Sequence, residues 1–142
     1  MRILNEVEAA TVDPEWLSRE TEDERKEAER RFQEYRAGRK PPILEGKTII
    51  IVDDGIATGL TMRLAVRAVK AQRPQKVIVA VPIAPPESIA ELKHEGADEV
   101  IVLEAPGEFA GAVGAHYLRF DQVEDAHVVR LLQRSAGIAG AQ

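Results

Sequence analysis

The stretch that most constrains the fold of this chain covers residues 47–61, with the sequence KTIIIVDDGIATGLT. Residues 48–52 are all β-branched, and such an unbroken run is typical of a parallel-sheet strand covered on both faces. The run ends in Asp53 and Asp54, and a turn containing glycine leads into helical spacing from Met62. The stretch therefore predicts a strand, an acidic tip, a turn and a helix start. Open α/β sheets bind ligands at such a place, outside the carboxyl end of a strand.

The turn after the strand has the residues of a phosphate cradle. Gly55 and Gly59 allow a positive φ and a close approach of backbone to ligand, because neither carries a Cβ atom. The amides of residues 57–61 are the unpaired donors of a helix start, where the helix dipole favours an anion. The hydroxyl groups of Thr58 and Thr61 add two more donors at the same place.

The two aspartates suit a different partner. Carboxylates accept hydrogen bonds and repel phosphate, so Asp53 and Asp54 suit hydroxyl groups or a metal ion. A phosphate site beside a hydroxyl site describes a ribose 5-phosphate, and the stretch predicts a phosphosugar ligand. A Walker loop is excluded because Leu60 stands where its lysine would be. A receiver domain is excluded because the later strands end in Pro82 and Glu104, where that domain needs a further aspartate.

With the isoleucine run before it, VDDGIATGLT resembles the phosphoribosyl-pyrophosphate (PRPP) motif of type I phosphoribosyltransferases. VAVPIAPPES at 79–88 and FAGAVGAHYLRF at 109–120 resemble one bacterial branch of that family, so the resemblance covers nearly the whole chain. It implies an α/β fold, a parallel sheet with helices on both faces. It also implies that the acidic pair holds the ribose hydroxyls and that Ala57, Thr58, Gly59 and Thr61 hold the 5-phosphate. The residues implied in binding PRPP or a ribose 5-phosphate are Asp53, Asp54, Gly55, Ile56, Ala57, Thr58, Gly59, Leu60 and Thr61.

The family transfers phosphoribose from PRPP to a nitrogenous base and releases pyrophosphate. The resemblance therefore implies a role in nucleotide metabolism and a magnesium ion that comes with PRPP. Catalytic residues are not identified, and Ala57 stands where purine-salvage members carry an aspartate that contacts the base. The three histidines lack metal-ligand spacing, so no metal site of the chain's own is predicted. Two alternatives stay open, a non-catalytic module that binds PRPP or a nucleotide 5-phosphate, and an inactive interaction fragment.

Residues 1–40 are predicted to form an N-terminal helical arm and residues 41–142 the α/β core. Asp13 and Pro14 have the character of an N-cap and a first helical position, and the helix should end at about Ala37. Its dense charge indicates a solvated arm. The alternative is a helix that packs on a second subunit, or one that folds over the ligand with Arg30, Arg31 or Arg36 near a pyrophosphate.

In the core, strands at 76–81 and 99–103 alternate with helices, which predicts parallel strands joined by right-handed crossovers. The helix from 61 to 72 is expected to turn Leu64, Ala68 and Ala71 inward, with Val66 and Val69 beside them. The loop at 105–114 should lie at the same sheet edge as the acidic turn. Further helices are expected at 85–94 and 121–132, followed by a frayed tail at 135–142.

Relatives in the family place more chain before the motif than the about 46 residues found here. Strand 48–52 is therefore predicted to be an open sheet edge, or to be paired by another chain or by a segment foreign to the family. An apolar edge favours a homodimer. A formal net charge of −5 argues against a nucleic-acid partner. No apolar run approaches membrane-spanning length, no signal-peptide pattern is present, and a soluble cytoplasmic protein is expected.

Overall fold

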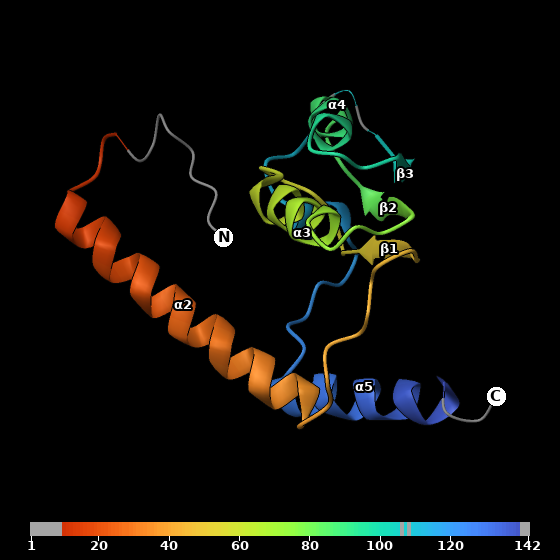
Figure 1. Ribbon diagram of the computed structural model, residues 1–142. Helices are drawn as coiled ribbons and strands as arrows, with labels where there is room; N and C mark the ends of the chain where they lie inside the picture. Colours follow the sequence, from red (N-terminus) through yellow and green to blue (C-terminus); the bar gives the residue numbers. More distant parts are fainter. Residues whose placement is uncertain (1–9, 106, 108, 140–142) are drawn as a thin grey trace. The chain divides into compact units, whose positions relative to one another are not determined.

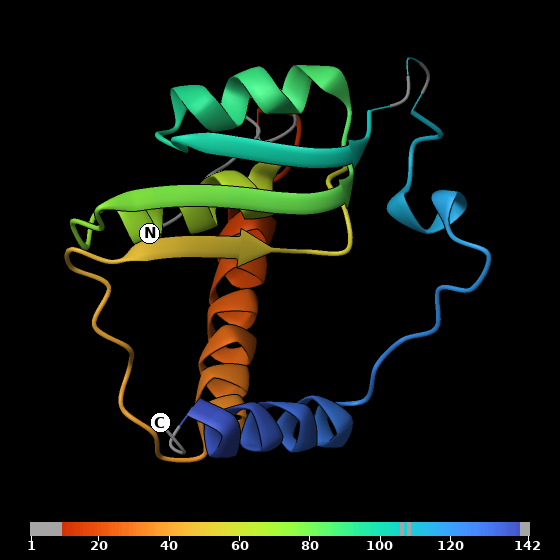
Figure 2. The same ribbon diagram turned by 90° about the vertical axis from the view of Figure 1, so that its right-hand side faces the viewer.

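The computed structural model describes residues 10–105, 107 and 109–139, which divide into two compact units (Figures 1 and 2). The core unit is Pro42–Phe120, and the helical unit holds residues 10–41 and 121–139. Within the helical unit, the helix in residues 14–36 packs on the helix in residues 125–139.

The core unit is a parallel sheet of three strands in the order β1-β2-β3. The strands are β1 (Thr48–Val52), β2 (Lys76–Ile83) and β3 (Glu99–Glu104), and they are joined by helices α3 (Leu60–Lys70) and α4 (Pro86–His94). The predicted α/β class with a parallel sheet is confirmed. Strand β2 runs two residues past its predicted end, through Pro82. The last β1 partner of β2 is Ala80, so Pro82 has no β1 residue to which an amide would donate.

The sheet buries one face far more than the other. Along β2, Val77, Val79, Val81 and Ile83 are buried, and the residues between them are only partly covered. Helices α3 and α4 lie on the same side of the strands in Figure 1, and their residues Val66 and Leu92 share the buried core with Val79. The other face exposes Ile50 by 60%, Val52 by 71% and Leu103 by 78%. In the core unit, α3 and α4 both contribute to the covered side of the sheet. An apolar run shows that a strand is half-buried at least, but not how many layers cover it.

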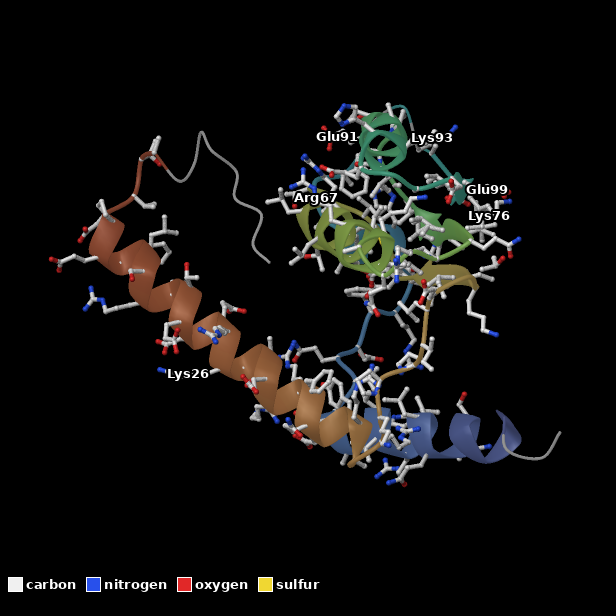
Figure 3. The ribbon with its side chains drawn as sticks, in the orientation of Figure 1. Lys26, Arg67, Lys76, Glu91, Lys93 and Glu99 are labelled. Atoms are coloured by element: carbon white, nitrogen blue, oxygen red, sulfur yellow. The ribbon has the colours of Figure 1, made fainter. Side chains whose placement is uncertain are left out.

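Strand β1 lies at the edge of the sheet. Among the described residues it pairs only with β2, from Thr48 opposite Lys76 to Val52 opposite Ala80. The predicted edge position is confirmed for this part of the chain, and the homodimer stays a prediction. Lys76 and Glu99 are the first residues of β2 and β3, and their side chains form an ion pair of 2.8 Å at the amino ends of these strands (Figure 3).

Helix α3 packs through a different stripe from the predicted one. Met62 and Val66, one turn apart, are almost fully buried, whereas Leu64 is only half-buried. Ala68 and Ala71 are exposed. Helical spacing identifies candidate stripes, and the geometry of the turn before the helix decides which of them meets the sheet.

The helical unit consists of α2 (Pro14–Arg36) and α5 (Asp125–Ala139). Asp13 is the predicted N-cap of α2, and its Oδ1 accepts from the Glu15 amide at 2.9 Å. No residue of α2 is buried, which agrees with a solvated arm. Helix α5 begins four residues later than predicted and continues to Ala139, beyond the predicted start of the frayed tail. Within the described residues, no helix is both long and apolar enough to cross a membrane.

Candidate functional site

The turn of residues 53–61 joins the carboxyl end of β1 to the start of α3. Its side chains divide into an exposed set and an anchoring set. The exposed residues are Asp53, Asp54, Ala57, Thr58 and Thr61. The partly or fully buried residues are Gly55, Ile56, Gly59 and Leu60, with Ile56 only 2% exposed. The turn is thus fixed to the core through its buried positions, and the groups with hydrogen-bonding chemistry face solvent.

Gly59 gives α3 an unobstructed start. It is the N-cap residue with φ of 74°, in the left-handed region that favours glycine, and no side chain caps the helix. The first intrahelical bond runs from the Arg63 amide to the Gly59 carbonyl at 2.8 Å. Among the described residues no hydrogen bond uses the amides of residues 57–61. These amides can therefore donate to an anion placed before the helix.

Gly55 was predicted to adopt a positive φ, and it does not. Glycine is required at this position for another reason. A Cβ atom on Gly55 would lie 2.6 Å from Val113 Cγ1 and 2.8 Å from Ile83 Cγ2, which is too close for any side chain. The next residue is tied down by a hydrogen bond of 2.9 Å from the Ile56 amide to the Ile83 carbonyl. Glycine is needed at position 55 because the acidic turn packs directly on β2 and on the segment around Val113.

The acidic pair lies at the tip of this turn. The Asp54 amide donates to Asp53 Oδ1 at 3.0 Å, and the hydroxyl of Tyr117 donates to the Asp54 carbonyl. The pKa of the Asp54 carboxyl is raised above its usual value, mainly by partial desolvation and to a smaller extent by repulsion from the charge of Asp53. Asp54 is nevertheless exposed, so its carboxylate can accept hydrogen bonds from a ligand.

The segment after β3 reaches the acidic turn, as predicted for the loop at that sheet edge. It contains the single-turn helix η1 (Val113–His116), and two aromatic rings of the segment stack on each other. Phe109 and His116 stack with ring centroids 5.0 Å apart, and His116 Nε2 accepts from the Ala110 amide at 3.2 Å. Sequence reasoning did not assign Val113 and Tyr117 to the site. Their only signal was their place inside the segment FAGAVGAHYLRF.

The described residues contain no group of three histidine, aspartate or glutamate side chains that could hold a metal ion. Asp53 and Asp54 are two adjacent carboxylates, fewer than the ligands that a protein-held magnesium or calcium ion takes. A cation at this turn would therefore have to bring most of its ligands with it, as a metal–phosphate complex does.

Comparisons with known proteins identify similar sequences and a similar fold. Residues 1–114 match the family model of the phosphoribosyl transferase domain. Two proteins from Mycobacterium tuberculosis strains CDC 1551 and H37Rv, each named "Putative phosphoribosyl transferase", are 42% identical to this chain over 109 residues. Those matches cover 77% of this chain and 24% of each relative, so the chain spans about a quarter of their length. The crystal structure of the protein TT1426 from Thermus thermophilus matches with a TM-score of 0.72 and 40% identity, over 87% of this chain and 58% of that one.

Proposed function

This chain belongs to the phosphoribosyl transferase domain family, and on that premise we propose that its Asp53–Thr61 turn binds PRPP or another ribose 5-phosphate. The observation that carries the proposal is the row of unpartnered amides at 57–61 beside two exposed carboxylates. An anion at a helix start meets both the free amides and the favourable end of the helix dipole.

The two ends of such a sugar would be recognised by two separate groups of atoms. The amides and the hydroxyls of Thr58 and Thr61 donate to the 5-phosphate, because an ionised phosphate oxygen only accepts. The carboxylates of Asp53 and Asp54 accept from the 2- and 3-hydroxyls of the ribose. The buried Ile56 between the two groups fixes their spacing.

The proposal extends to transfer of phosphoribose to a nitrogenous base. The base nitrogen would form a bond to C1 of the ribose while the bond from C1 to the pyrophosphate oxygen breaks, and pyrophosphate would leave with both electrons of that bond. Positive charge develops on the ring in such a displacement. Carboxylates bound to the adjacent hydroxyls stabilise that charge, which is the contribution expected of Asp53 and Asp54. Magnesium bound with PRPP would neutralise the leaving pyrophosphate.

Calorimetric titration with PRPP and magnesium, and then with AMP, tests the binding step. A hydrogen bond to a charged phosphate is worth roughly 1.5–3 kcal/mol, so Thr58→Ala should weaken binding about tenfold or more. Thr48→Ala is the matched control, because Thr48 is an exposed threonine at the opposite end of β1. Equal affinities for wild type and Thr58→Ala would remove the phosphate cradle from the proposal.

Pyrophosphate release separates a transferase from a module that only binds. Wild-type protein mixed with PRPP, magnesium and a panel of nitrogenous bases should release pyrophosphate with at least one of them. Tight PRPP binding without release by any base would instead favour the non-catalytic binding module.

A further inference from the structure

We propose that Tyr117 is a positioning residue for the acidic pair, holding the Asp54 carbonyl so that the two carboxylates face the sugar diol. This inference rests on the proposed function and names one more residue on which that site depends. Tyr117 lies 63 positions along the chain from Asp54, beyond the last strand of the sheet.

The residues of the acidic turn are held by contacts of different kinds. The Asp53 carboxylate accepts from the next amide, Gly55 packs on β2, and the Ile56 amide is bonded to the Ile83 carbonyl. The Asp54 carbonyl has the Tyr117 hydroxyl as its donor. Asp54 itself is exposed, so burial does not fix its conformation.

The residue after Asp54 makes this restraint necessary. Gly55 must lack a Cβ atom because it packs on Val113 and Ile83, and glycine has more accessible backbone conformations than any other residue. The peptide between Asp54 and Gly55 is therefore the part of the turn that would rotate most easily. A hydrogen bond to its carbonyl opposes that rotation. Repulsion between the two neighbouring carboxylates, which contributes to the raised pKa of Asp54, would otherwise favour their separation.

The hydroxyl of Tyr117 is itself well placed to act as a fixed donor. Its amide bonds the Gly114 carbonyl at 3.2 Å, and its ring lies 5.2 Å from the ring of Phe120 between centroids. A Cβ atom on Gly114 would lie 2.9 Å from Phe120 Cδ1, so this loop too is closely packed. The donor therefore comes from a braced loop within the same compact unit as the turn.

The test compares ribose 5-phosphate with 2-deoxyribose 5-phosphate by calorimetry, because the two differ only in a hydroxyl that the acidic pair would accept from. Wild type should prefer ribose 5-phosphate. In Tyr117→Phe, the affinity for ribose 5-phosphate divided by that for 2-deoxyribose 5-phosphate should fall about three- to tenfold, which corresponds to one hydrogen bond. The fall should come from weaker binding of ribose 5-phosphate. Affinity for the deoxy sugar should change little, since the amides at 57–61 remain in place.

Tyr35→Phe is the matched control. Tyr35 is the other tyrosine of the chain, and its hydroxyl also donates, to Asp125 Oδ1 at 2.7 Å in the helical unit. Removing that hydroxyl should leave the ratio unchanged. Val113→Ala provides a second variant, which keeps the Tyr117 hydroxyl but loosens the same loop on Gly55. It should lower the ratio by a smaller factor.

The outcomes separate this inference from the function on which it rests. A wild-type preference for ribose that persists in Tyr117→Phe overturns the role of Tyr117 and leaves the proposed function standing. Equal losses for both sugars in Tyr117→Phe also overturn it, because they indicate general loosening of the site. Absence of binding of either sugar to wild type overturns the proposed function and this inference together.

Discussion

The core unit and the helical unit are stabilised by opposite means. In the core unit Val66, Val77, Val79 and Leu92 have no exposed surface. In the helical unit α2 buries no residue, and ion pairs link its side chains to one another and to α5. The candidate site belongs to the first kind of structure, because the turn that carries it is attached to β2 and α3. A binding site benefits from that rigidity, whereas a charged helix such as α2 keeps its conformation through local pairs.

The arginines of α2 include Arg30 and Arg31, for which a position near a pyrophosphate group is the alternative to a solvated surface. Arg30 pairs with Glu27 at 2.7 Å and with Asp125 at 2.9 Å, and Arg31 pairs with Glu27 at 2.7 Å. Lys26, which projects from the middle of α2 in Figure 3, pairs with Asp23 at 3.3 Å. These charges have partners on their own unit, so the structure explains them without a ligand.

The largest expected effect is loss of a buried side chain in the core unit. Leu92→Ala should lower the free energy of unfolding by about 2–5 kcal/mol, because it leaves a cavity between α4 and the sheet. Phe32→Ala in the helical unit, where the ring is 47% exposed, should cost only about 1 kcal/mol, since it loses partial burial and an exposed stacking contact with Arg36. Denaturant unfolding measures both. Equal losses would break the contrast between the two units.

A smaller effect is expected at Glu95, whose side chain is 6% exposed between two arginines. Arg63 Nη2 and Arg67 Nη2 each lie 2.7 Å from Glu95 Oε1. Glu95→Gln should lower the free energy of unfolding by roughly 1.5–3 kcal/mol, the value of a hydrogen bond to a charged group. These bonds join α3 to the end of α4, so the loss falls within the core unit.

The carboxyl group of Glu95 should also make the free energy of unfolding depend on pH. Hydrogen bonding to Arg67, reinforced by Arg63, lowers the pKa of the Glu95 carboxyl from 4.5 to about 2. A lowered folded-state pKa stabilises the protein above pH 4.5, and that stabilisation disappears as the pH falls from 4.5 towards 2. Unfolding followed from about pH 6 to about pH 2 should therefore lose less stability in Glu95→Gln than in wild type. Parallel curves would contradict the prediction.

The smallest effect is expected at Glu27. Hydrogen bonds from Arg30 and then Arg31 lower the pKa of its carboxyl to about 2, as low as that of Glu95. Its side chain is 36% exposed on the surface of α2, where water and salt screen the charges. Glu27→Gln should change the unfolding midpoint by little more than the error of the measurement, and less again in high salt. A loss as large as that of Glu95→Gln would show that exposure does not distinguish the two pairs.

The sequence was sufficient for features that depend on neighbouring residues. The strand before Asp53, the left-handed Gly59 and the N-cap Asp13 all follow from local geometry, and all three are found as predicted. The features that escaped prediction depend on contacts between distant residues. The packing of Gly55 on Val113, the donor at Tyr117 and the inward face of α3 are set by how β2 and the last loop meet the turn. No periodicity in the chain encodes those contacts.

We propose that the amides after the acidic pair bind the phosphate of a ribose 5-phosphate. The direct test is a titration of isotope-labelled protein with ribose 5-phosphate, followed through the backbone amide resonances. The largest shifts are expected at residues 57–61, with smaller ones at Asp53 and Asp54 and none in α2 or α5. At saturating ligand, unchanged amide resonances at residues 57–61, or shifts confined to resonances of the helical unit, would contradict this proposal.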